Sequence, residues 1–307
     1  MSGMLIFSRL PKKYRSWLKA RVFEARRTVV KVLMAYDGPK LLSCLRSLGI
    51  ESGDTVLLHS SFEEHHGFQG SIQEVTDVFV EAVGPRGHLL MVSLPYRSSS
   101  FLYLSKLKRF DVRKTPSMMG MLSELFRRRP GVLRSLSPSH PMLVHGPRAA
   151  WFVADHQACQ YPCGPGSPFE KLLTSDAKAL FYNTSFDAYT FFHYLEHLVS
   201  SQMPFRLYTE QPFQAQVIDH DGVPSTVPTY AFAADAMQRR RFEILEHELR
   251  KRNAIKELRI GNGSVQVVRI RETVECVLDM SRRGVYFYDL TGLPPPSIDR
   301  ARLVTRA

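Results

Sequence analysis

The chain has 307 residues, of which 44% are hydrophobic and 23% charged, a composition typical of a soluble globular protein with a sizeable core. No apolar run reaches the roughly 18 residues of a membrane-spanning helix, and the N-terminal segment lacks the pattern of a signal peptide. The four cysteines, Cys44, Cys159, Cys163 and Cys276, form no disulfide framework, so a reducing, cytoplasmic setting is expected.

The net charge of +12 is concentrated toward the two ends of the chain. Residues 1–40 carry +8 and residues 239–307 carry +6, whereas residues 41–238 carry −2. A nucleic-acid-binding module normally spreads its positive charge across the folded domain. The near-neutral central body and the lack of a recognition motif therefore argue against a nucleic-acid partner.

The N-terminal segment has the pattern of an amphipathic helix over residues 8–34. Its apolar residues recur at steps of three and four, and Arg and Lys cover the opposite face. Such a helix either packs against its own domain or lies on an anionic membrane surface. The resulting division of the chain is a basic helix over 1–38, a folded domain over 39–285 and a C-terminal tail over 286–307.

The first part of the domain predicts a strand–helix–strand unit. A short helix covers 38–48, and the β-branched run 55–58 predicts a buried strand that ends at His59-Ser60-Ser61. A capping box of Ser71 and Glu74 opens the next helix, and a second strand covers 87–92. This order indicates an α/β protein with a parallel or mixed central sheet flanked by helices.

The middle of the chain is less regular. Residues 97–113 are polar and predict an exposed loop or lid, after which Thr115 caps a helix that has Pro116 at its first position. A strand at 142–144 and a helix at 151–159 follow, and Ser167 and Glu170 form a second capping box. Cys159 and Cys163 lie near His156, but Pro162 interrupts the spacing and no second pair exists, so no metal site is expected.

The stretch from 178 to 200 carries the strongest chemical signal. A strand over 179–182 meets a polar break at 183–185, and a helical pattern then places Thr190, His193 and Glu196 at steps of three. Residues three apart share one face of a helix. An imidazole beside a carboxylate is a candidate general base, although a structural pair in the core has the same spacing.

The last part of the chain predicts strands at 205–208 and 213–218 with a turn at 219–222. Residues 229–259 are helical in pattern and basic, a strand covers 265–268, and a final helix covers 271–282. The proline-rich segment from Pro294 onward predicts a loose tail.

Taken together, six segments occur in an order that is specific to one family. They are Gly53–Ser61, Gly84–Met91, Phe110–Gly120, Pro130–Ser135, Gly164–Pro168 and Thr190–Glu196. By these segments the sequence resembles the aminoglycoside 3-N-acetyltransferase family over roughly residues 40–283. The resemblance implies the antibiotic N-acetyltransferase fold, a mixed α/β fold unlike that of the GNAT acetyltransferases, with the N-terminal helix as an addition.

The resemblance also implies roles for individual residues. His193 is the expected general base, with Glu196 and Thr190 beside it, and acetyl-CoA is the expected co-substrate with no metal. His59, Ser60 and Ser61 are expected near the acyl-CoA arm. The candidates for the phosphates and pantetheine are Thr115, Ser117, Arg134, Ser135 and Ser167.

Departures from the family pattern bear on the acceptor. Ser137 stands where many relatives have a histidine, which His140 replaces in part, and Asn183 stands for a usual glycine. The acidic stretches expected around a polycationic antibiotic are not evident, so another amine is favoured, such as an amino sugar on a nucleotide or lipid carrier. An aminoglycoside acetyltransferase that confers resistance, and a scaffolding homologue that has lost the chemistry, are the alternatives.

Overall fold

The computed structural model describes residues 14, 21, 29–30, 32–63 and 66–297. Most of the predicted N-terminal helix over 8–34 therefore lies outside the described residues. Within it, Val30 is buried, whereas Val29 and Leu33 are exposed. None of the helices in this described part is long and apolar enough to cross a membrane.

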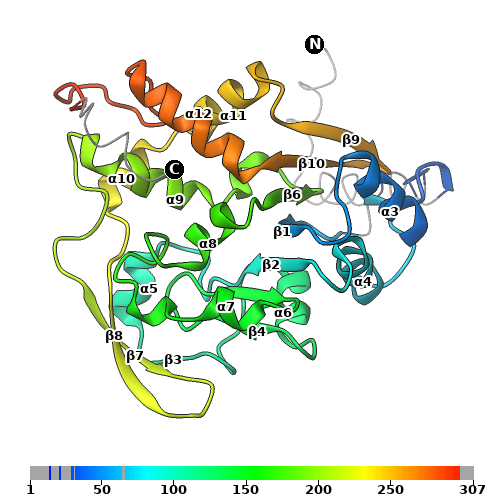
Figure 1. Cartoon of the computed structure of the whole chain (residues 1–307), viewed down its shortest axis with the longest axis horizontal. Coiled ribbons are helices and arrows are strands. Elements are labelled where there is room, and N and C mark those ends of the chain that lie inside the picture. The colour runs from blue at the N-terminus through cyan, green and yellow to red at the C-terminus, as the bar shows by residue number, and fades with distance from the viewer. Residues whose placement is uncertain (1–13, 15–20, 22–28, 31, 64–65, 298–307) are drawn as a thin grey trace.

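A seven-stranded mixed sheet forms the centre of the molecule, which confirms the predicted fold class (Figure 1). Only β1 is parallel to both of its neighbours, β2 and β6, and every other pairing in this sheet is antiparallel. The strand order is β4(133–134), β5(142–145), β2(88–92), β1(55–60), β6(178–182), β10(263–269) and β9(256–260). The three parallel strands end at the same edge, where α/β proteins commonly place ligand groups.

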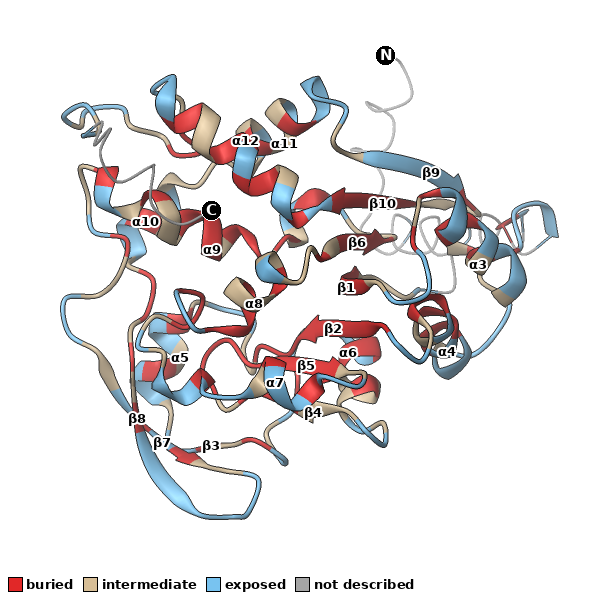
Figure 2. Cartoon of the chain, viewed as in Figure 1, coloured by how far each residue is buried: buried red, intermediate tan, exposed pale blue. Residues whose placement is uncertain are grey.

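Helices cover both faces of this sheet (Figure 2). One core cluster contains the apolar sides of α3(38–47), α4(72–83) and α6(121–127). The other contains α7(149–153), α8(168–174), α9(192–199), α11(242–251) and α12(270–282). The side chains of Tyr286, Phe287 and Tyr288 lie in this second cluster, although the sequence assigned them to the tail.

A smaller sheet lies beside the main one and holds β3(110–111), β7(213–218) and β8(224–229) in the order β3-β7-β8. Residues 97–113 contain α5(100–106) and β3, so the prediction of an irregular loop is wrong, whereas the predicted exposure holds for much of the segment. Ser99 caps α5 by accepting from the amide of Leu102, and Leu104 is buried under it. The helix is short, and a short helix gives a weak periodic signal.

Several predicted ends and caps need correction. Thr115 does not cap a helix, because its hydroxyl accepts from the amide of Asp111 and α6 begins six residues later, after Gly120 at φ 106. The Ser71–Glu74 capping box is confirmed in full. In the second predicted box Ser167 is at the N-cap position, but its hydroxyl makes no cap bond, and Glu170 accepts from the amide of Gly166.

The segment predicted as one helix over 229–259 is divided. It contains α10(234–239), α11 and the edge strand β9, which pairs antiparallel with β10. The strand expected at 205–208 is reduced to an isolated bridge between Tyr208 and Phe232. The helix expected at 151–159 is a short α7 followed by a 3-10 turn at 156–158.

Candidate active site

The candidate base and its carboxylate lie on α9, just beyond the carboxyl end of β6. His193 and Glu196 are three residues apart, and His193 Nδ1 is 2.8 Å from Glu196 Oε2. Thr190 precedes the helix rather than sharing its face, and it accepts from the amide of His193 through its carbonyl. Its hydroxyl is buried and has no partner among the described residues. The structure thus brings the side chains of His193 and Glu196 together, whereas Thr190 is joined to His193 through the backbone in the turn before the helix.

Glu196 is completely buried and has three side-chain partners. Arg240 donates from Nε to Oε1 at 2.7 Å and from its terminal nitrogen to Oε2 at 2.8 Å. The hydroxyl of Tyr288 donates to Oε1 at 2.7 Å. With His193, four hydrogen bonds satisfy both oxygens, which is the condition under which a carboxylate is tolerated in a protein interior.

Aromatic side chains also pack around His193. The ring of Phe232 lies 4.7 Å from the imidazole, and the ring of His140 lies 5.5 Å away, edge-on. The Nδ1 of His140 is 3.0 Å from Ser139 Oγ, and its Nε2 is 3.3 Å from the hydroxyl of Tyr96. His140, expected to stand in for the histidine absent at 137, therefore lies next to His193.

The electrostatics of the pair favour a neutral imidazole. Burial and the nearby Arg240 lower the pKa of His193, and the bond to Glu196 offsets this only in part. Burial alone would raise the pKa of Glu196, but Arg240 and His193 outweigh it and keep the carboxyl ionised. The side chain of His193 is 12% exposed, and among the described residues none bonds its Nε2. Nε2 is thus available to a ligand.

The predicted acyl-CoA residues lie at the end of β1, which pairs with β6 up to Ser60 and Tyr182. His59 is buried against Phe181, with the rings 5.1 Å apart, and burial lowers the pKa of His59 to about 3. Its Nε2 has no partner within the described chain. The amide of Ser61 donates to the carbonyl of Tyr182, so the strand pairing continues past the end of β1.

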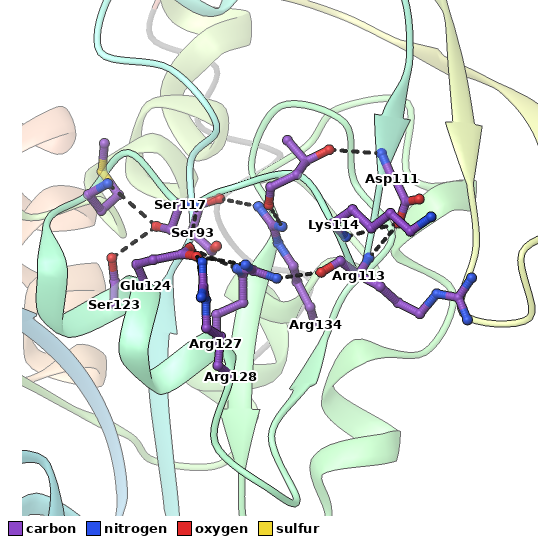
Figure 3. A network of polar contacts seen from close by, with 12 residues as sticks. Ser93, Asp111, Arg113, Lys114, Ser117, Ser123, Glu124, Arg127, Arg128 and Arg134 are labelled. Carbon is purple, nitrogen blue, oxygen red and sulfur yellow. Dashed lines mark hydrogen bonds and ion pairs between the residues drawn. The ribbon is translucent and has the colours of Figure 1, made fainter. Parts of the chain in front are cut away.

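Most of the predicted phosphate and pantetheine residues are engaged in internal bonds (Figure 3). Arg134 is 3% exposed, and its guanidinium donates to the carbonyls of Ser93, Val112 and Thr115. Burial lowers the pKa of Arg134 to about 9. The hydroxyl of Ser117 is 2.9 Å from that of Ser123.

Two predicted serines differ in their bonding. Ser135 Oγ accepts from the amide of Met142 and is 2.7 Å from His156 Nδ1. The other ring nitrogen of His156 is 2.7 Å from the carbonyl of Pro162, so both nitrogens of this histidine have protein partners. Ser167 Oγ, in contrast, is buried and unpartnered in the described structure. The described residues contain no group of three His, Cys, Asp or Glu side chains placed to hold a metal.

Arg240 and Tyr288 are functional candidates that the sequence did not single out. They follow the pair by 44 and 92 residues, respectively, counted from Glu196. An isolated antiparallel bridge joins Arg240 to Tyr288 and delivers both side chains to the same carboxylate. A long-range pairing of this kind leaves no periodic signal in the sequence.

Comparison with known proteins matches the chain to one family. The family model for aminoglycoside 3-N-acetyltransferase matches residues 57–282. The chain is 28% identical over 171 residues to aminoglycoside N(3)-acetyltransferase III of Pseudomonas aeruginosa, covering 52% of the chain and 62% of the relative. It is 28% identical over 192 residues to the type VII enzyme of Streptomyces paromomycinus, covering 55% and 65%. The matched region is thus less than two thirds of the length of these relatives.

Solved structures agree in fold. The apoenzyme of aminoglycoside acetyltransferase AAC(3)-IVa superposes with a TM-score of 0.68 at 22% identity, covering 86% of this chain and 96% of that chain. AAC-VIa bound to sisomicin gives 0.66 at 25% identity, covering 81% and 98%. Since the family model matches most of the chain and these structures share its fold, the protein belongs to the aminoglycoside 3-N-acetyltransferase family.

Proposed function

We propose that this protein is a cytoplasmic acetyl-CoA-dependent N-acetyltransferase that acetylates the amine of an amino sugar or a related small molecule. The observation that carries the proposal is the buried His193–Glu196 pair, in which Nδ1 of His193 meets the carboxylate at 2.8 Å and the imidazole side chain keeps 12% of its surface exposed. Family membership supports the reaction type. A relative in the same fold, AAC-IIIb, has a solved binary structure with CoASH, which supports acetyl-CoA as the co-substrate.

The chemistry is a direct transfer. The free amine attacks the thioester carbonyl, and His193 Nε2 removes the proton that the nitrogen then carries. The carbon–sulfur bond breaks, the thiolate leaves as CoA and takes up a proton, and the acetyl amide is the product. A positioned base of this kind contributes about 10²–10⁴-fold to the rate, and holding the amine beside the thioester supplies much of the remainder.

The residues that would hold the co-substrate are those with unsatisfied polar groups near the carboxyl edge of the parallel strands. Nε2 of His59 and the hydroxyls of Ser93 and Thr190 are buried without partners in the described chain. Unsatisfied buried groups are costly unless a ligand or water meets them. We therefore place His59, Ser60 and Ser61 along the acyl-pantetheine arm. Arg134 has a supporting role, because its terminal nitrogens already donate to three carbonyls, although its Nε has no partner in the described chain.

The charges around His193 support an acceptor other than a polycation. Glu196 is the carboxylate at the site, and Arg240, Tyr288 and His193 already satisfy it. Phe232 and His140 provide neutral surfaces. An amino sugar carried on a nucleotide or a lipid diphosphate matches this site and the basic flanks of the sequence. A lipid carrier would match a membrane contact of the helix that the sequence predicts over 8–34.

The experiment is an acetyl-transfer assay with the purified full chain, acetyl-CoA and a panel of amines, in which free thiol and product mass are both measured. We expect stoichiometric thiol and acetyl amide with an amino-sugar acceptor, and a loss of about 10²–10⁴-fold in kcat for His193→Gln. Full turnover by His193→Gln would exclude the assigned base.

Two other functions compete with this one. The names of the relatives favour an aminoglycoside as acceptor, and protection of a susceptible host from the drug would support that function. Ser137, in place of the family histidine, motivates a scaffolding protein without chemistry. Titration calorimetry that detects no binding of acetyl-CoA would favour the scaffold over both enzymes.

A further inference from the structure

Glu196 accepts more hydrogen bonds than the single one that is needed to orient His193. We propose that Arg240 is a positioning residue of this site: it compensates the charge of Glu196, so that His193 works as a neutral base and the acceptor amine is bound uncharged. This inference rests on the proposed function, because it specifies the state in which that acceptor binds.

The geometry of the pair is that of a strong, fixed contact. The guanidinium of Arg240 meets both oxygens of Glu196 in a fork, at 2.7 and 2.8 Å. The two side chains are 10% and 0% exposed. Bidentate pairs of this kind restrict orientation as well as adding energy, and their interaction is weakly screened when buried. The carboxylate therefore faces the imidazole with its charge already matched.

The titratable groups that face the pair come from several elements. They are Tyr96 before α5, His140 after β4, Cys163 before α8, Tyr208 after α9, Arg240 after α10 and Tyr288 near the end of the described chain. Burial raises the pKa of Cys163, Tyr208 and Tyr288, and it lowers that of His140, so these four groups are neutral near pH 7. The charges that act on His193 are thus those of Glu196 and Arg240.

Within the described part of the chain, a positively charged acceptor at His193 has no unpaired counter-ion. The guanidinium of Arg240 lies over the ring of Phe232, 4.7 Å from its centre, and Phe232 in turn lies 4.7 Å from the imidazole. An ammonium at His193 would approach the Arg240 cation and find no unpaired carboxylate. A neutral amine avoids this repulsion and is also the nucleophilic form. The expected substrate class is therefore an amine of low basicity, such as one whose neighbouring carbons carry oxygen.

The decisive experiment measures the titration of the His193 imidazole by NMR in the full chain, with the resonance assigned by its loss in His193→Gln. The wild-type midpoint is expected below the ordinary histidine value of about 6.5. In Arg240→Met the uncompensated carboxylate stabilises the imidazolium, so the midpoint is expected to rise by about one unit or more. Arg240→Gln is a second neutral variant that keeps a donor for Glu196, and the same direction is expected.

A matched control is available one residue away. Arg241 forms a half-exposed pair with Asp289, so Arg241→Met removes the same charge without touching Glu196. Its His193 midpoint is expected to stay at the wild-type value. A wild-type midpoint above 6.5, or equal shifts in the Arg240 and Arg241 variants, would overturn the inference. A wild-type midpoint above 6.5 overturns the inference even if both Arg240 variants fail to fold, because a compensated carboxylate cannot raise the pKa of His193.

A kinetic measurement then tests the uncharged acceptor. With a series of amines of different pKa, the acid limb of kcat/KM is expected to follow the pKa of each amine, because the neutral form binds. An acid limb that ignores the amine pKa would overturn this part. The titration does not require turnover. A protein that shows the expected shifts but acetylates nothing would therefore refute the proposed function and leave the role of Arg240 standing. Turnover without the shifts refutes the role of Arg240 alone.

Discussion

The substitution Glu196→Gln tests the central network at its most buried point. The carboxylate accepts four hydrogen bonds, two from Arg240, one from Tyr288 and one from His193. Glutamine has the same shape but offers a single acceptor oxygen, and its amide nitrogen only donates. Whichever way the amide is turned, one N–H of Arg240 faces another donor, and the guanidinium loses its counter-charge.

The expected cost follows from this geometry. Removing one partner of a buried ion pair destabilises a protein by about 3–5 kcal/mol, because the remaining charge is left uncompensated. If the amide nitrogen turns toward His193, it donates to Nδ1 and leaves the proton on Nε2, so that the base is lost. We therefore expect Glu196→Gln to lower the free energy of unfolding by about 3 kcal/mol and kcat by about 10²–10⁴-fold.

Urea unfolding followed by circular dichroism measures the first effect, and the acetyl-transfer assay measures the second. The double variant Glu196→Gln/Arg240→Met removes the uncompensated charge along with its partner, so it is expected to be more stable than Glu196→Gln alone. If the two single costs simply add, the residues do not form the coupled pair described above. A Glu196→Gln protein with wild-type stability would refute the reasoning altogether.

Three further predictions concern other parts of the molecule. Burial lowers the pKa of His59 to about 3 and of His156 to about 4, both below the unfolded value of about 6.5. Their stabilising contribution is complete above pH 6.5 and is lost as the pH falls from the unfolded toward the folded pKa. The urea midpoint should therefore drop between about pH 6.5 and 4, and a flat profile would contradict the burial of these rings. Arg134→Met should lower the free energy of unfolding by about 1–3 kcal/mol, because three carbonyls lose their donor. The KM for acetyl-CoA should change less than about tenfold. An unchanged stability with a much higher KM would instead assign Arg134 to the phosphates. Gly87→Ala places a Cβ 2.3 Å from the carbonyl oxygen of Val83 and 2.6 Å from that of Asp54, so its unfolding midpoint should fall well below that of the wild type, and an unchanged midpoint would show that the close approach is relieved.

The sequence predicted the parts of the fold that rest on local patterns. The strand at 213–218 and the Ser71–Glu74 capping box are as expected, because β-alternation and capping depend on near neighbours. The prediction of an irregular loop over 97–113 was wrong, because the short helix in this segment has too few turns to show a hydrophobic period. The edge strand β9 was predicted as part of a helix from its local sequence pattern. In the structure its pairing with β10 overrides that local preference.

The candidate site divides in the same way. The contact between His193 and Glu196 could be predicted, because both residues lie on one turn of one helix; the role of His193 as the base stays a prediction. Arg240 and Tyr288 could not be found, because only the tertiary fold brings the segment after α10 and the end of the described chain to the same carboxylate. Ser117, Arg134 and Ser135 were named as ligand groups because the family resemblance implied it. The structure gives their side chains protein partners, which the sequence motifs could not reveal.

The most direct test of the account is a single-turnover measurement of acetyl transfer to an amino-sugar acceptor by the wild-type chain and by His193→Gln. Acetyl-CoA labelled in the acetyl group allows the product amide to be followed by mass. If His193 is the base, one labelled amide forms per CoA released, and the rate constant of the variant is lower by about 10²–10⁴-fold. Equal rate constants for the two proteins would contradict it, since the imidazole would then play no part in moving the proton.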